Sequence, residues 1–213
     1  MSFKVTATAS KEFGEIPPAG THPAILVGLV DLGTQEVAYQ QKISHVRKVL
    51  LLWELTTEKM SGFKDRNFIV QRDYTMTFSE KSSLRGLMEE WRGKAFSAND
   101  EIDLAVMVGK PCFVSIIHET KGDRTFSKIK SVGQVPKGMT VAPAQTKPFS
   151  WELGNGPIPD VLKDPWMPYI FGESIEDVIN HCDEWKGKKG QGAGNGNGNK
   201  QGEYQTPDDS TPF

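Results

Sequence analysis

The sequence has little cysteine and no long apolar run. Its 213 residues include only Cys112 and Cys182, and two widely separated cysteines do not form a disulfide framework. No segment approaches the roughly 20 apolar residues needed to cross a bilayer, and the first residues lack the apolar core of an export signal. We therefore expect a cytoplasmic protein without membrane contacts, in which both thiols are reduced.

Sequence signatures of catalysis and metal binding are also missing. The histidines are scattered, and His181-Cys182 has no second pair at metal-ligand spacing, so we expect no metal site. The Gly-rich stretch 190–198 follows no strand and contains no Lys-Ser or Lys-Thr, which excludes a phosphate-binding loop. No Gly-x-Ser-x-Gly is present. We expect neither an enzyme nor a cofactor.

Charge is divided unequally along the chain. Residues 1–140 carry 19 basic and 16 acidic side chains, whereas residues 141–213 carry 6 basic and 11 acidic ones. The net charge of −2 is thus the sum of a mildly basic N-terminal part, residues 1–140, and an acidic C-terminal part, residues 141–213. This asymmetry is a weak indication of an anionic ligand.

Hydrophobic periodicity predicts five strands and one helix within the first 140 residues. The strands are expected at residues 22–32, 46–56, 67–78, 112–118 and 125–132. The helix is expected at 82–91, between the third and fourth strands, with Ser79 or Ser82 as its cap and Gly93 at its end. This is the element order of the OB-fold, a five-stranded Greek-key barrel. We therefore expect a mainly β protein with an OB-fold domain over residues 1–140.

Local signals refine this prediction. Gly28 lies inside the first strand, which indicates a bulge or sharp bend. The polar segment 33–44 is expected to be a loop. Lys121-Gly122-Asp123 is typical of a hairpin turn between the last two strands.

Two appendages are expected after residue 140. Residues 141–186 form an arm rich in proline and aromatics, with a short helix begun by Ser174 and an apolar stripe from Ile175 to Cys182. This arm is expected to pack on the barrel or on a neighbouring subunit, or to cover a binding groove. Residues 187–213 form a Gly-rich tail, which is expected to be disordered.

The tail ends in PDDSTPF, with two carboxylates, a proline and a C-terminal phenylalanine. A basic, apolar pocket on another protein can capture such a tip. The tail resembles those of bacterial and phage single-stranded DNA-binding proteins, which it matches at Asp208, Asp209, Pro212 and Phe213. Thr211 stands where that family commonly has an apolar residue. The body, in YTMTFSEKSSLRGLMEEWRGKAF and VGKPCFVSIIHE, is similar to phage-encoded members of the family.

The resemblance implies sequence-independent binding of single-stranded DNA during phage replication and recombination. It also implies that the tip recruits replication or recombination proteins, that the location is the host cytoplasm, and that homo-oligomers are an option. The alternative is an OB-like protein–protein adaptor or structural phage protein that binds no nucleic acid, because a fold does not fix a function.

A face that binds single strands needs cations for phosphates and flat rings for bases. The second, third and fifth strands supply both, and the predicted DNA-binding residues are Arg47, Lys48, Trp53, Arg66, Phe68, Arg72, Tyr74, Phe126, Lys128 and Lys130. Alternation puts Phe126, Lys128 and Lys130 on one face. Any single ring is more often core than ligand contact, and the apolar neighbours of Trp53 favour burial.

Deleting residues 208–213 tests the role of the tip. We expect affinity for single-stranded DNA to stay unchanged or to rise, because acidic groups are removed, while recruitment of partner proteins is abolished. Titration with oligo-dT and co-precipitation with replication proteins measure the two effects. Normal partner binding by the truncated chain would contradict the assignment.

Overall fold

The computed structural model describes residues 15–186, apart from residues 41, 64, 99, 123 and 171 and the side chains of residues 39 and 124. The expectations for the tail 187–213, including Asp208, Asp209, Pro212 and Phe213, lie outside the described residues.

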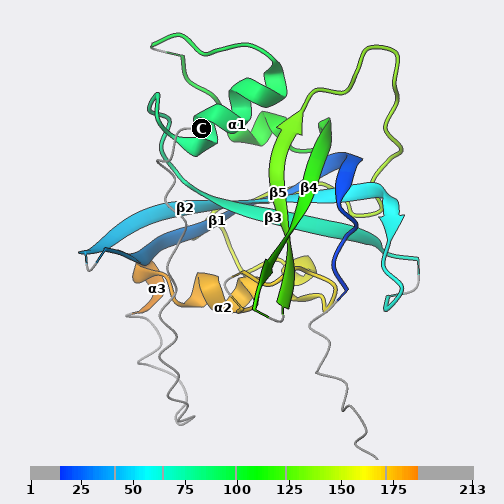
Figure 1. Ribbon diagram of the computed structural model, residues 1–213. Coiled ribbons are helices and arrows are strands. Elements are labelled where there is room, and N and C mark those ends of the chain that lie inside the picture. The colour runs from blue at the N-terminus through cyan, green and yellow to red at the C-terminus, as the bar shows by residue number, and fades with distance from the viewer. Residues whose placement is uncertain are drawn as a thin grey trace, which may run out of the picture.

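The described chain is mainly β and forms one six-stranded sheet (Figure 1). Its first five strands run in the order β3-β2-β1-β4-β5, each antiparallel to its neighbour. They span β1 (Gly20–Tyr39), β2 (Lys42–Lys59), β3 (Asn67–Thr75), β4 (Pro111–Lys121) and β5 (Arg124–Gly133). A short β6 (Phe149–Trp151) pairs parallel to β1. All five expected strands are present, and β6 was not expected.

The expectation of a loop at 33–44 is wrong. β1 and β2 continue as a paired ribbon to the register Tyr39↔Lys42. A two-stranded ribbon that extends past the core is exposed on both faces, so its strands need no apolar side chains. A polar composition therefore suggested a loop where the chain forms a hairpin.

Gly28 lies at a bulge, as predicted. The register of β1 with β2 shifts between Leu26 and Gly28. A Cβ at Gly28 would lie 2.7 Å from Leu52 Cδ1 and 3.0 Å from Phe149 Cζ. Any larger residue would therefore require the Leu52 side chain and the Phe149 ring to shift. The predicted hairpin is also present, since β4 ends at Lys121 and β5 begins at Arg124.

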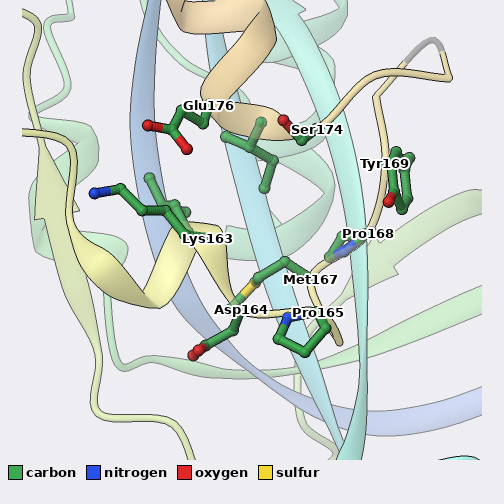
Figure 2. Close-up of a pocket in the computed structure, with 10 residues that line it drawn as sticks. Lys163, Asp164, Pro165, Met167, Pro168, Tyr169, Ser174 and Glu176 are labelled. Carbon is green, nitrogen blue, oxygen red and sulfur yellow. The ribbon is translucent and has the colours of Figure 1, made fainter.

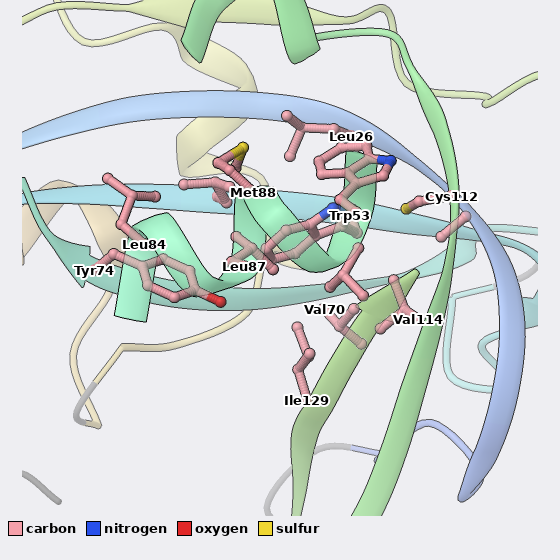
Figure 3. Close-up of a cluster of buried hydrophobic side chains, with 14 of the residues drawn as sticks. Leu26, Trp53, Val70, Tyr74, Leu84, Leu87, Met88, Cys112, Val114 and Ile129 are labelled. Carbon is pink, nitrogen blue, oxygen red and sulfur yellow. The ribbon is translucent and has the colours of Figure 1, made fainter. Parts of the chain in front are cut away.

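Helix α1 (Ser83–Arg92) lies between β3 and β4 and follows its predicted signals. The Ser82 side chain accepts a hydrogen bond from the Arg85 N–H, and Gly93 ends the helix with φ 65°. Its apolar stripe packs into a core between the helix and one face of the sheet (Figure 3). That core includes Leu26, Trp53, Val70, Val114 and Ile129. We call it the α1-side core.

A second core covers the opposite face of β1, β2 and β3. Because side chains alternate along a strand, Leu51 and Trp53 face α1 while Leu50 and Leu52 face the other way. The arm supplies the partners of the second set through β6, η2 (Asp160–Lys163), α2 (Ile175–Asn180) and α3 (Asp183–Lys186). The arm therefore packs on its own sheet and shares a core with it. We call this the arm-side core.

Glu54 fastens the beginning of the arm to the sheet. Its side chain is buried and accepts hydrogen bonds from Asn67 Nδ2 at 2.8 Å, Gln145 N at 2.7 Å and Thr146 N at 2.8 Å. A buried carboxylate is costly unless such donors surround it. Glu54 therefore serves as a specific anchor at the point where the chain returns to β2 and β3.

Glu184 fastens the end of the arm. Its carboxylate accepts hydrogen bonds from the Thr34 N–H at 2.9 Å and the Thr34 hydroxyl at 2.7 Å. Desolvation raises the pKa of Glu184, but these hydrogen bonds outweigh it and lower that pKa from 4.5 to about 2. Next to it, Gly33 makes room for Cys182, whose Cβ would lie 2.8 Å from a Cβ at that position.

Replacing Glu54 tests the anchor. Glu54→Gln replaces one acceptor oxygen with an NH2 group facing N–H donors, so we expect the free energy of unfolding to fall by about 2 kcal/mol. Urea denaturation followed by tryptophan fluorescence measures the loss. Glu36→Gln, on the exposed β1–β2 ribbon, is the matched control and should be neutral. Equal stability of the two variants would contradict the anchoring role.

Acid should loosen the end of the arm in a defined window. The folded pKa of Glu184 lies below its usual value, so the contact stabilises the fold fully above pH 4.5 and is lost as the pH falls towards about 2. Urea unfolding of wild type and Glu184→Gln across this range measures the effect. We expect a difference in stability at pH 7 that shrinks on acidification; a constant difference would exclude the linkage.

Candidate nucleic-acid interface

Three predicted stacking residues are buried in the α1-side core. Trp53, Phe68 and Tyr74 all have exposed fractions of 4 % or less. Trp53 packs against Trp91, with ring centroids 6.5 Å apart. The prediction that these rings stack on bases is therefore wrong, because no ring face reaches the surface. Alternation correctly grouped Phe68 with Tyr74, but their shared face points inward.

The cations of β2 are engaged within the protein. Lys48 is buried and forms an ion pair with Asp73 at 2.6 Å. Arg47 pairs with Asp31, and hydrogen bonding and charge attraction from that carboxylate raise the pKa of Arg47. The Arg47 side chain is half exposed, but Lys48 is enclosed and is not available to a phosphate.

Arg66 contacts the arm. Its guanidinium lies 4.2 Å from the centroid of the Trp166 ring, and Phe63 meets the same ring edge-on. A cation over an aromatic face is a favourable contact. Arg66 therefore helps hold the arm against the β2–β3 turn.

The arm covers the other face of β2 and β3, so neither face of these strands is open to a ligand where the two cores pack on them. One sequence signal could have shown this. Residues 49–53 read VLLLW, without alternation, and a strand with successive apolar residues is typically buried on both faces. The sheet face opposite α1 is therefore closed by the chain itself.

The β5 residues lie together on the surface, as alternation predicts. Phe126 is 47 % exposed, and Lys128 and Lys130 are exposed beside it, whereas Ile129 points into the α1-side core. Lys128 Nζ lies 3.0 Å from Glu119 Oε1 in a pair that is largely open to solvent. Such a pair contributes little to stability, so Lys128 can exchange Glu119 for another anion.

Arg72 contacts the backbone of β5 from β3. Its Nη1 donates to the carbonyl oxygen of Ile129 at 3.4 Å, and its guanidinium lies 5.1 Å from the Tyr74 ring centroid. It therefore reaches from β3 to β5, the two ends of the strand order. We call the set Arg72, Phe126, Lys128 and Lys130 the β5 strip; it holds four of the ten predicted residues.

A shallow pocket opens elsewhere, within the arm (Figure 2). Its volume is about 140 Å³, and its lining comes from η2, the segment after it and the start of α2, including Lys163, Met167 and Tyr169. None of the predicted DNA-binding residues lines it. Both polar and apolar groups line the pocket, and no group of catalytic residues converges on it.

Metal-ligating residues do not gather among residues 15–186 as described. That part contains no group of three or more His, Cys, Asp or Glu side chains placed to hold a metal ion. His22 lies within hydrogen-bonding distance of the Pro18 carbonyl and of Glu58, and His118 of the Pro17 carbonyl. Both cysteines are unpaired and buried, and burial raises their pKa. None of the described helices is long and apolar enough to cross a membrane.

Comparison with known proteins adds no relative. No protein-family model matches the chain, and no curated protein matches it.

Proposed function

We propose that this protein binds single-stranded DNA without sequence preference along the β5 strip. The observation that carries the proposal is that an exposed ring, Phe126, and two exposed lysines, Lys128 and Lys130, lie on β5, whose backbone Arg72 contacts from β3. Cations attract the phosphates, and a ring stacks on any base because every base has a flat face. Sequence-independent binding follows from that chemistry.

The strand order supports an OB-fold as the scaffold. The order β3-β2-β1-β4-β5, with α1 between β3 and β4, would become a barrel if β3 met β5. The Arg72 side chain donates a hydrogen bond from β3 to the backbone of β5, and such a contact suits the partly open barrel of that fold. The OB-fold binds oligonucleotides with the face of its second and third strands and with two loops, one of which joins the fourth and fifth strands; Phe126 lies close to that loop.

The tail belongs to the same proposal. Its resemblance to the tails of single-stranded DNA-binding proteins rests on Asp208, Asp209, Pro212 and Phe213. We propose that this tip binds replication or recombination proteins while the β5 strip holds the DNA. The division of charge between the front and the back of the chain supports separate tasks for the two regions.

The enclosed sheet face favours the alternative, an adaptor that binds no nucleic acid. The arm-side core leaves much less open surface on β2 and β3 than we expected from the sequence. An adaptor of this kind would bind oligo-dT at neither low nor high salt, so one experiment separates the two functions.

Charge removal on β5 tests the proposal directly. We expect the wild-type chain to bind oligo-dT, and its affinity to fall steeply with salt because phosphate contacts release counterions. In Lys128→Gln/Lys130→Gln the logarithmic salt slope should become shallower by about 0.7 per lost contact. Fluorescence anisotropy at several salt concentrations measures both quantities.

Two further variants complete the design. Phe126→Ala should weaken binding by ~1–3 kcal/mol at every salt concentration, because stacking does not release counterions. Lys163→Gln, which removes an exposed lysine from the arm, is the matched charge control. Absence of oligo-dT binding by the wild type at low salt would refute the proposal, and equal effects of the control and β5 variants would refute the site.

A further inference from the structure

Tyr169 is an exposed ring that the function proposed above does not use. Among side chains that the structure describes, the exposed aromatic ones are Phe126 and Tyr169, with Tyr169 67 % exposed. Nothing in the sequence distinguishes it, because it lies in a segment where rings and prolines are frequent. In Figure 2 it stands at the edge of the arm pocket, on the side away from Lys163 and Glu176.

The backbone that carries Tyr169 is held in place. Ile170 is buried, and its N–H and carbonyl form reciprocal hydrogen bonds of 2.9 Å with Glu173. Pro168 precedes the tyrosine and restricts the chain, and Met167 is buried in the arm-side core. An aromatic side chain on a fixed backbone offers a large contact area and loses little conformational entropy when it binds.

Two hydrogen bonds link consecutive residues of β3 to the arm and to β5. The Gln71 side chain donates from Nε2 to the Tyr169 carbonyl at 3.1 Å, and Arg72 donates to the Ile129 carbonyl at 3.4 Å. Gln71 and Arg72 are consecutive residues of β3 whose side chains point to opposite faces. The arm and β5 therefore approach the same point of β3 from its two sides.

Phe126 lies near that point. It precedes Ile129 by three residues, which is about 10 Å along a strand. In Figure 1 the β4–β5 hairpin passes across β3. β5 and the arm are therefore both linked to the short stretch of β3 at Gln71 and Arg72.

We propose that Tyr169 is a second stacking platform for the single strand held by the β5 strip. The arm then has two tasks: it covers one face of the sheet, and it forms one wall of the binding groove. The inference rests on the proposed function, because it assigns a further contact residue to the same site. The ligand at Tyr169 is a base and not a phosphate, because an uncharged ring offers a face for stacking and no charge for a phosphate.

Two variants of Tyr169, one without the aromatic ring and one that keeps it, distinguish stacking from other roles of this residue. We expect Tyr169→Ala to weaken oligo-dT binding about 5- to 150-fold, the equivalent of one lost stacking contact. Tyr169→Phe should bind within about threefold of wild type, because the ring remains. The salt slope should be unchanged in both variants, in contrast to Lys128→Gln/Lys130→Gln, because no phosphate contact is lost.

An abasic oligonucleotide gives an independent measurement. A strand of the same length without bases keeps every phosphate but offers nothing to stack on, so wild type and Tyr169→Ala should bind it equally. Val106→Ala, which removes an exposed apolar side chain from η1 (Leu104–Met107), is the matched control and should leave oligo-dT binding unchanged. Urea denaturation of each variant verifies that the fold is retained.

The outcomes separate the two proposals. If wild type binds oligo-dT and Tyr169→Ala binds it equally well, the role of Tyr169 is refuted while the β5 strip stands. A loss in Tyr169→Ala that persists on the abasic strand also refutes stacking, because the effect is then structural. If the wild type itself binds no oligo-dT, both proposals are refuted.

Discussion

Burial of both faces of β1, β2 and β3 is the constraint on which the rest of this structure depends. Each strand sends alternate side chains into the α1-side core and the arm-side core. Where both faces are packed, at residues 24–32 of β1, 49–55 of β2 and 68–70 of β3, the strands offer no open face to a ligand. The sites left for binding are therefore at the ends of the strand order and on the projecting hairpins, and the β5 strip lies at one of these ends.

The arm covers its face of the sheet through hydrogen bonds and close approaches at glycines as well as through apolar packing. Gly28 and Gly33 let the arm approach β1 more closely than any side chain would allow. Glu54 and Glu184 accept hydrogen bonds at the two ends of the arm. A covering segment that carries specific contacts at its beginning and its end is a fixed part of the fold, so its surface residues have defined positions.

The sequence predicted local features of the chain well, but it did not show which face of each strand is buried. Helix α1 and the bulge at Gly28 were found because capping residues and glycine act through their immediate neighbours. Alternation grouped Phe126 with Lys128, and it also grouped Phe68 with Tyr74, but the period alone does not say which group faces inward. That depends on what covers the strand. The covering segment here is distant in sequence, which is also why Tyr169 was not selected.

The attachment of α3 also fixes where the remainder of the chain departs. Glu184 accepts a hydrogen bond from Thr34, and Asp183 lies against His45. These contacts hold residue 186 close to the β1–β2 ribbon. Phe126, by contrast, is near the tip of a different hairpin. The described chain therefore ends beside the β1–β2 ribbon and not on the β5 strip, so the surface assigned to the nucleic acid and the start of the tail belong to different hairpins.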